Sequence, residues 1–303
     1  MGNGNRVPRL ARQVFTRLYP PSRLAFYLQR TILHPNRRKK IAGLLASRLP
    51  KSANQLVTSG QLRLVRELEE SGFAYLSDLV SRRQIDEIFE YLRDKKCYDR
   101  WRPESGEFLI SDAPSNCHVA PYMDVDVMRC PHLLRIANHS DILAAMEKLF
   151  GCKPTLSQLG LWWSLPGHSK AEDAELFHRD VDEWQFIKLF VYLTDVDSCS
   201  GPHVFIKGSP AVKKLIRIQR YADCDVEREF GMENIIRFTG KAGTAFLENT
   251  FGLHKGQMPT SGNRLLFQAQ YSLHRIGIYR YNPLLRGPED SELDPYINRL
   301  FLR

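Results

Sequence analysis

The sequence predicts an α+β fold in which helices come first and an antiparallel β core follows. The chain has 303 residues, with 43% hydrophobic and 25% charged residues, an ordinary globular composition. Up to Gly151 the apolar residues recur mainly at helical spacing, and after it they form short runs typical of strands. No apolar run approaches the ~18 residues of a membrane-spanning helix, so we expect none.

The N-terminal fifth of the chain is strongly basic. Residues 1–66 contain 14 lysines and arginines and no acidic residue, whereas the other 237 residues contain 29 basic and 34 acidic residues. We therefore predict a basic helical extension over residues 1–55 and a mildly acidic domain over residues 56–303. Because the basicity is confined to the extension, which has no recognised nucleic-acid-binding motif, we expect no nucleic-acid partner.

Two short amphipathic helices are expected in this extension. Leu10, Val14 and Leu18 indicate the first, and Pro20-Pro21 separates it from a second that begins near Ser22. Such a segment can pack on the acidic body, act as an organelle transit peptide, or make peripheral contact with a membrane through residues 1–50. The six cysteines include no CxxC pair, and with no secretory signal we expect reduced thiols in a cytoplasmic protein, or an organelle-targeted one if the segment is a transit peptide.

Helices alternate with loops in the next part of the chain. Apolar stripes predict helices over 60–68, 81–92 and 141–150, and a short strand over 73–76. Ser81 and Gln84 form a capping-box pattern. Residues 98–130 are polar and aromatic with several prolines, and long irregular stretches of this kind often line sites.

Strands dominate the last part of the chain. The strand over 184–194 would place Phe186, Lys188 and Phe190 on one face and aliphatic residues on the other. The aliphatic face suits packing against helices, and the aromatic face suits the lining of a site. Strand-like segments occupy 155–164, 184–194, 202–206, 243–247 and 264–272.

A His-x-Asp pattern at His178 and Asp180 is the first candidate metal site. In a strand, residues two apart point to the same side, so one imidazole and one carboxylate can bind a single metal ion. His254 lies between two strand-like segments and can supply a third ligand. Two histidines and one aspartate form a facial triad, which leaves open coordination positions on Fe(II).

The same pattern occurs a second time, at His139 and Asp141. There Ser140 suits a helix N-cap, Asp141 suits the first helical turn, and an apolar helical stripe follows. We interpret this second pair as structural.

Two basic residues on predicted strands need anionic partners. Arg264 begins the last strand, and a buried guanidinium without an anion is costly, so either a dicarboxylate cosubstrate or a structural carboxylate must accompany it. Lys188 would bind a cosubstrate carboxylate or the substrate if it faces the site, and it would extend to solvent if it lies at the strand end.

With these motifs in place, residues 71–271 resemble the phytanoyl-CoA dioxygenase family of Fe(II)- and 2-oxoglutarate-dependent oxygenases. The resemblance rests on these segments together: the Gly72-Phe73 strand, the helices at 81 and 141–151, His178-Arg179-Asp180, Tyr192 to Asp197, Ser200-Gly201-Pro202 with Lys207-Gly208-Ser209-Pro210, His254 and Arg264.

The resemblance implies a double-stranded β-helix, or jelly roll, with N-terminal helices packed on one sheet. It implies that His178, Asp180 and His254 hold Fe(II) and that Arg264 binds 2-oxoglutarate, with Lys188 as a second candidate. The expected reaction hydroxylates a C–H bond of a small-molecule, acyl or lipid substrate and releases succinate and CO2. A cupin-like metal-binding barrel or a non-catalytic jelly-roll protein is the alternative, although neither needs Arg264.

Overall fold

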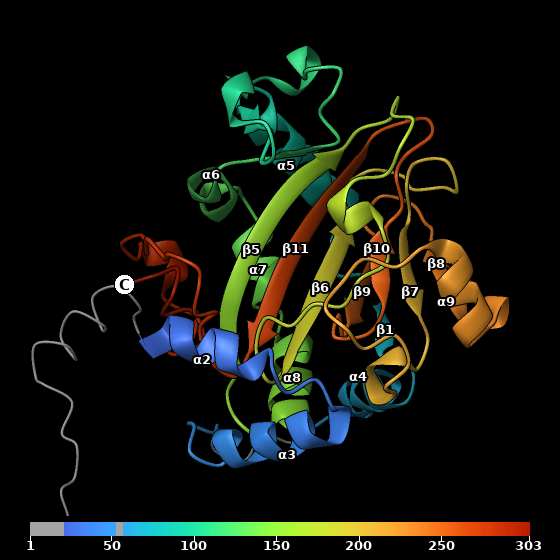
Figure 1. Cartoon of the computed structure of the whole chain (residues 1–303). Coiled ribbons are helices and arrows are strands. Elements are labelled where there is room, and N and C mark those ends of the chain that lie inside the picture. Colours follow the sequence, from blue (N-terminus) through green and yellow to red (C-terminus); the bar gives the residue numbers. More distant parts are fainter. Residues whose placement is uncertain (1–20, 53–56) are drawn as a thin grey trace, which may run out of the picture.

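The computed structural model describes residues 21–52 and 57–303 (Figure 1). The predicted helix over 10–18 and the predicted boundary at residue 55 lie outside the described residues. Among the described helices, none has the length and apolar character needed to cross a membrane.

A six-stranded antiparallel sheet forms the centre of the molecule, in the order β1-β9-β6-β11-β5-β4. The expectation of an α+β fold with antiparallel strands is confirmed, because every described pairing between named strands is antiparallel. The strands of this main sheet are β1 (Phe73–Leu76), β4 (Val119–Pro121), β5 (Thr155–Ser164), β6 (Phe186–Tyr192), β9 (Ala245–Glu248) and β11 (Arg264–Ser272).

A second, smaller sheet lies against one end of the main sheet, in the order β10-β7-β8. Its strands are β7 (His203–Ile206), β8 (Ile235–Phe238) and β10 (His254–Gly256). Buried aromatic side chains from both sheets meet between them, among them Phe190, Phe205 and Phe246. This aromatic layer closes one end of the space between the sheets.

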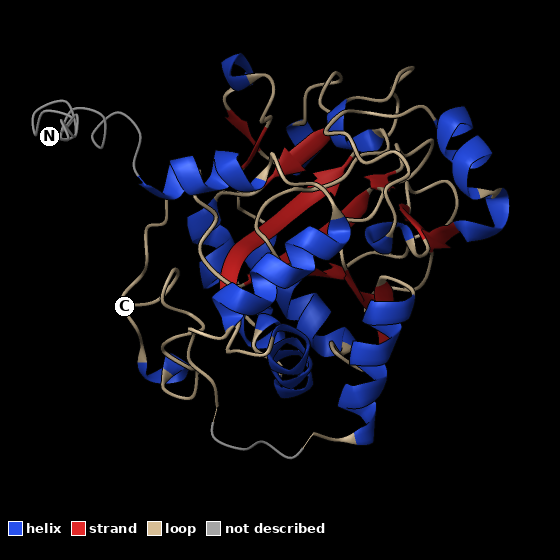
Figure 2. Cartoon of the chain, turned by 60° about the horizontal axis from the view of Figure 1, so that its bottom comes forward, coloured by secondary structure: helices blue, strands red, loops and turns tan. Residues whose placement is uncertain are grey.

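Helices cover the outer face of the main sheet (Figure 2). As predicted, the aliphatic side chains of β6, such as Leu189 and Val191, pack with Ile88 and Met146 of these helices in the largest core cluster. The described helices before the last strands are α2 (Pro21–Gln29), α3 (Pro35–Ala46), α4 (Ser59–Glu70), α5 (Arg82–Leu92), α6 (Asp124–Arg129), α7 (Leu133–Ala137) and α8 (Ser140–Phe150). One further helix, α9 (Asp223–Phe230), lies beside the smaller sheet, where Val226 packs with Val204 and Ile235 (Figure 1).

Local sequence signals determine where several of these elements begin and end. Ser81 and Gln84 make the predicted capping box, and an equivalent box at Thr58 and Gln61 begins α4. Gly151 ends α8 in the left-handed conformation (φ +75°). The sequence missed α9, β8 and the short β2–β3 hairpin (Cys97–Tyr98 and Glu107–Phe108), since elements this short carry weak periodicity.

Candidate metal centre

The predicted triad is assembled by backbone pairing between two segments that are far apart in the chain. His178 and His254 form an antiparallel bridge, in which the N–H of His178 donates to the carbonyl of His254 (2.9 Å) and the reverse bond measures 3.0 Å. The N–H of Asp180 donates to the carbonyl of Thr250 (2.9 Å). An extended segment therefore presents His178 and Asp180 on one side, against the strand that carries His254.

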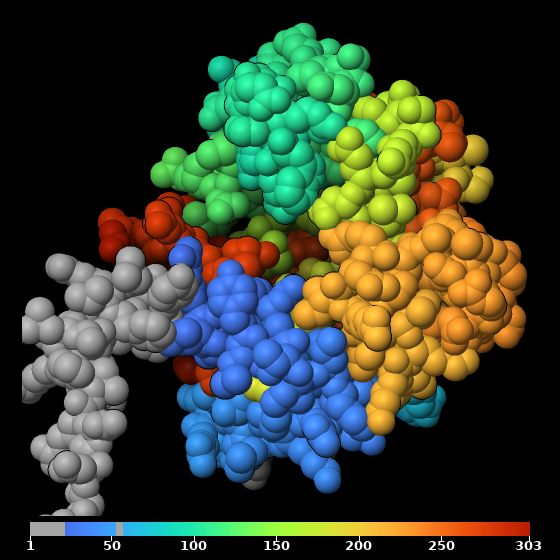
Figure 3. All heavy atoms as spheres, in the orientation of Figure 1, coloured from blue at the N-terminus to red at the C-terminus, as the bar shows by residue number. Residues whose placement is uncertain are grey.

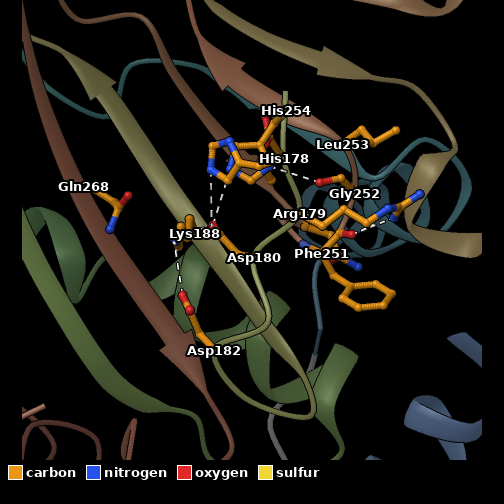
Figure 4. Close-up of polar contacts among 12 residues, drawn as sticks. His178, Arg179, Asp180, Asp182, Lys188, Phe251, Gly252, Leu253, His254 and Gln268 are labelled. Atoms are coloured by element: carbon orange, nitrogen blue, oxygen red, sulfur yellow. Dashed lines mark hydrogen bonds and ion pairs between the residues drawn. The ribbon is translucent and has the colours of Figure 1, made fainter. Parts of the chain in front are cut away.

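The three side chains have the geometry of a metal site. One ligand atom from each of His178, Asp180 and His254 lies within 4.8 Å of the others, and the two rings face the carboxylate (Figure 4). The Nδ1 atoms bond the carbonyls of Leu176 (2.9 Å) and Gly252 (3.0 Å). These bonds place the ring protons on Nδ1, so both Nε2 lone pairs point toward Asp180, as in metal-ligating histidines.

The charges of the triad also suit a cation. Burial and the neighbouring His254 lower the pKa of His178 to about 3, so this imidazole is neutral. Burial opposes protonation of His254 as well, but the Asp180 carboxylate outweighs it and raises the pKa of His254. For Asp180, burial would raise the pKa, yet Lys188 and the two histidines hold it well below its usual range. Protonation of His254 at Nε2 therefore competes with the binding of a metal ion.

Lys188 lies beside the triad rather than at a solvent-exposed strand end. Its Nζ is 2.6 Å from Oδ2 of Asp180 and 3.5 Å from Oδ2 of Asp182 (Figure 4). The lysine is 8% exposed, so the interpretation that it extends to solvent is wrong. Its anionic partners among the described residues are Asp180 of the candidate triad and Asp182, and contact with a cosubstrate remains a prediction.

Arg264 is buried without a carboxylate partner among the described residues. Its guanidinium donates to the carbonyl of Gly201 and to Oγ of Ser164 (2.9 Å), and its Nε has no partner. The side chain is 3% exposed, and burial lowers its pKa. Gly256 lies two residues after His254 on β10, and a Cβ at this position would lie 3.1 Å from Nη2 of Arg264. The guanidinium therefore lies against the strand that carries His254. A buried guanidinium without a carboxylate partner favours the binding of an anion.

The two cations lie at different depths in the space between the sheets. Lys188 pairs across the sheet with Gln270, six residues from Arg264 along β11. At the rise of an extended strand, six residues correspond to roughly 20 Å between the Cα positions. The two cations also have different partners: Lys188 contacts Asp180, whereas Arg264 donates to the carbonyl of Gly201 and to Oγ of Ser164.

His139 and Asp141 make contacts within and between helices, which agrees with the interpretation of this pair as structural. Nδ1 of His139 accepts a hydrogen bond from the N–H of Asp141 (3.3 Å), and Oδ1 of Asp141 accepts one from Gln61 (2.8 Å). One detail of the prediction is wrong, because His139 is the N-cap and Ser140 is the first helical residue.

Residues from the N-terminal segment hold the loop that follows Asp180. Nε2 of Gln29 donates to the carbonyl of Val181 (2.6 Å), and Arg38 donates to the carbonyls of Gln29 (3.0 Å) and Glu183. The guanidinium of Arg38 also lies 4.8 Å from the ring centroid of Phe251, on the segment that leads to His254. The sequence missed this contact, since nothing in a run of basic residues indicates which one is buried.

The inner face of the site contains further polar residues that sequence reasoning missed. His203 lies 3.1 Å from Glu248 through its Nε2, and its ring stacks on that of His254 with centroids 5.6 Å apart. Burial raises the pKa of Glu248 to about 8. Across the space, Gln268 lies opposite the triad (Figure 4) and donates to Gln158 (3.1 Å). Strand alternation places these residues on the face that points toward the site, and this alternation is the sequence feature that could have identified them.

Three tryptophans near the site differ in their surroundings: Trp162 packs with the aromatic layer between the sheets, whereas Trp163 and Trp184 pack on the helix side. The ring centroid of Trp184 lies 5.4 Å from the guanidinium carbon of Arg38. Trp184 precedes β6, which begins at Phe186, and it does not line the site. The predicted strand over 184–194 is correspondingly shorter, at Phe186–Tyr192.

Comparison with known proteins identifies the fold. No protein-family model and no curated protein match the sequence. The structure is similar to EctD from S. alaskensis with bound Fe, with a TM-score of 0.54 and 15% identity over 84% of this chain and 93% of that chain. EctD with 2-oxoglutarate and 5-hydroxyectoine gives a TM-score of 0.51 at 16% identity, covering 74% of this chain and 82% of that chain. SnoK, a non-heme alpha-ketoglutarate-dependent carbocyclase of nogalamycin biosynthesis, gives 0.50 at 16% identity, covering 72% and 87%. The chain thus has the fold of iron- and 2-oxoglutarate-dependent enzymes.

Proposed function

We propose that this protein is an Fe(II)- and 2-oxoglutarate-dependent dioxygenase that hydroxylates a C–H bond of an organic substrate and releases succinate and CO2. The observation that carries the proposal is the pairing of a His178–Asp180–His254 triad with a buried Arg264 that has no carboxylate partner among the described residues. A facial triad leaves positions open for a chelating cosubstrate, and a guanidinium fork fits a carboxylate. We further propose that the core is a jelly roll of the phytanoyl-CoA dioxygenase type.

Each residue has a defined task in this proposal. His178, Asp180 and His254 would hold the iron, with both imidazoles oriented by backbone carbonyls. Arg264 would bind the distal carboxylate of 2-oxoglutarate. Lys188 would hold the second oxygen of Asp180 and so favour single-oxygen ligation. When bound, the iron and 2-oxoglutarate supply the oxidising chemistry, while the protein supplies ligand geometry and a site shielded from water.

The substrate proposal is broader. The inner face offers amides, the partly buried carboxylate of Asp182 and the buried carboxylate of Glu248 beside an aromatic layer, which suits a small molecule or the polar end of an acyl or lipid substrate. The intact Asp180 favours hydroxylation over halogenation, because related halogenating enzymes replace this carboxylate with a small residue. EctD, bound to 5-hydroxyectoine, shows that a similar fold accepts a small molecule.

An anaerobic titration tests the proposal. Fe(II) followed by 2-oxoglutarate should produce a visible metal-to-ligand charge-transfer band in the wild-type protein. The band should be absent from Asp180→Ala and weakened in Arg264→Ala, while Asp141→Ala should behave as wild type. A cupin-like or non-catalytic jelly-roll protein would bind metal without this band. Absence of the band from folded, iron-loaded wild type would reject the oxygenase assignment.

The reaction outcome needs a separate measurement. Metabolite extracts are screened for compounds that stimulate succinate formation, and the product is weighed by mass spectrometry in the presence of excess chloride. A gain of one oxygen atom supports hydroxylation. A chlorinated product would contradict the role of Asp180 as a ligand, and an isomerised or cyclised product would revise the reaction while leaving the cofactor assignment in place.

A further inference from the structure

Exposed apolar and basic side chains occur together on two segments of the surface. The first segment comprises α2, α3 and the residues up to Lys51, and the second covers residues 207–222. Together they contain 13 lysines and arginines and no acidic residue. Six of the 13 large apolar side chains exposed in the described part of the chain also lie on them: Leu24, Tyr27, Leu28, Leu44, Val212 and Ile218.

The apolar side chains of α2 form an outward stripe. Leu24, Tyr27 and Leu28 follow the i, i+3, i+4 spacing of one helix face and are 42%, 58% and 64% exposed. The opposite face of α2 is already used, since Phe26 and Gln29 are buried against the body. The outward stripe is therefore not needed to attach the helix.

The cations around this stripe are mostly unpaired. Lys39 pairs with Glu69, Arg220 pairs with Asp173, and Lys214 donates to the carbonyl of Glu229. Eight further exposed cations make no ion pair with any described residue: Arg23, Arg37, Lys40, Arg48, Lys51, Lys207, Lys213 and Arg217. This arrangement leaves a net positive surface on which most of the exposed cations have no carboxylate partner among the described residues.

The two segments are neighbours in space. Leu33 and Ile216 pack on the same buried cluster of Val181, Phe186 and Phe251, next to the metal-ligand loops. The space-filling view shows the segment after residue 207 in contact with the N-terminal helices, and a hollow opening beside α2 (Figure 3). We call the exposed large apolar side chains and the unpaired exposed cations of these two segments the basic face: Arg23, Leu24, Tyr27, Leu28, Arg37, Lys40, Leu44, Arg48, Lys51, Lys207, Val212, Lys213, Arg217 and Ile218.

We infer that the basic face is a docking surface for an anionic lipid membrane. Leucine and tyrosine side chains enter the boundary between headgroups and acyl chains, and the surrounding lysines and arginines attract anionic headgroups. A second copy of the chain that met this surface through its own basic face would be repelled by the like charge. Residues 67–303 carry a net charge of −5, which favours this orientation over any other. Docking in this way places the hollow beside α2 next to the bilayer. The inference does not depend on the proposed reaction.

Co-sedimentation of the full chain with phosphatidylcholine vesicles, with and without phosphatidylglycerol, tests the inference. Wild type should bind only the vesicles that contain phosphatidylglycerol, and high salt should weaken the binding. The triple variant Lys40→Gln, Lys213→Gln and Arg217→Gln should bind roughly 100-fold more weakly, because each cation near an anionic surface contributes roughly fivefold. The triple variant Tyr27→Ser, Leu28→Ser and Ile218→Ser should also lose binding.

A matched control removes the same charge elsewhere. Lys96→Gln, Lys170→Gln and Arg237→Gln are exposed and lie outside the basic face, so this triple variant should bind as wild type. Circular dichroism and metal affinity should be unchanged in all three variants. Equal binding of the basic-face variants and wild type would overturn the inference. If the serine variant retained binding and wild type bound an RNA oligonucleotide tightly, the basic face would be a docking surface for a nucleic acid and not for a membrane.

Discussion

The two His-x-Asp sequences of this protein contain the same residue types at the same spacing and perform different tasks. At His178 and Asp180 the backbone is extended and bridged to His254, so the two side chains converge. At His139 and Asp141 the backbone enters α8, where residues two apart point in different directions. The difference shows that local backbone geometry, rather than composition, decides whether a His-x-Asp pair can share a metal ion.

The partners of the two aspartates differ in the same way. Asp180 bonds Lys188, a buried cation on a central strand, whereas Asp141 bonds the neutral amide of Gln61 in α4. The first arrangement keeps the carboxylate ionised in a buried site. The second connects two helices. The following predictions test this comparison in order of decreasing effect.

The largest expected effect is loss of metal. His178→Ala and His254→Ala should each abolish stoichiometric Fe(II) binding while remaining folded, because each removes one of three ligands. His139→Ala should retain iron and lower the free energy of unfolding by about 1 kcal/mol, the typical value of an N-cap. Metal analysis and urea unfolding measure the two quantities. Iron retention by both ligand variants would disprove the triad.

Arg264→Ala should retain iron and lose affinity for 2-oxoglutarate. The charge-assisted bonds to the carboxylate contribute about 1.5–3 kcal/mol each, so a loss of one bond weakens binding by roughly 10- to 100-fold. Arg264→Lys should recover part of the affinity, since it keeps the charge but not the planar fork. Calorimetric titration measures both, and an unchanged dissociation constant would refute the role of Arg264.

Lys188→Met should weaken metal binding by roughly 10- to 100-fold, the usual effect of removing a partner of a metal ligand. The affinity of the iron-loaded protein for 2-oxoglutarate should change little, because Arg264 lies far along β11. Gln61→Met, the matched change at Asp141, should alter only stability. A Lys188 variant that binds metal normally but loses 2-oxoglutarate would restore the cosubstrate role predicted from the sequence.

Metal affinity should fall as the pH is lowered. Asp180 raises the pKa of His254 above its ordinary value of 6.5 in the metal-free protein, and a protonated imidazole cannot ligate. Below that raised pKa, each pH unit should cost about tenfold in affinity, whereas well above it the affinity should be constant. Titrations with Co(II) at several pH values measure this profile. A flat profile through the acidic range would contradict the assigned coupling between His254 and Asp180.

The smallest expected change in metal affinity comes from the N-terminal segment. Arg38→Met removes hydrogen bonds to the carbonyls of Gln29 and Glu183, and the carbonyl of Glu183, left unpaired, costs about 1–3 kcal/mol of stability. Metal affinity should fall a few-fold, since the loop after Asp180 loses its support. Arg37→Met, one residue away and exposed, should change neither quantity. Identical behaviour of the two variants would show that the segment does not support the site.

The sequence by itself determined the triad and the main strands. Alternation along a strand is a local property, so the shared side of His178 and Asp180, the aliphatic face of β6 and the start of β11 at Arg264 could be predicted from neighbouring residues. The structural task of His139 and Asp141 was predicted for the same reason, because the helical stripe that follows them is local.

Only the tertiary structure decided the contacts between segments that are distant in the chain. Lys188 pairs with Asp180, Arg38 holds the carbonyl of Glu183, and His203 meets Glu248 because the packing of sheets and helices brings them together. A buried charge must find a partner, but the sequence does not indicate which of many candidates lies within reach. The physical reason is that periodicity specifies the face on which a side chain lies, whereas its neighbours across that face depend on the whole fold.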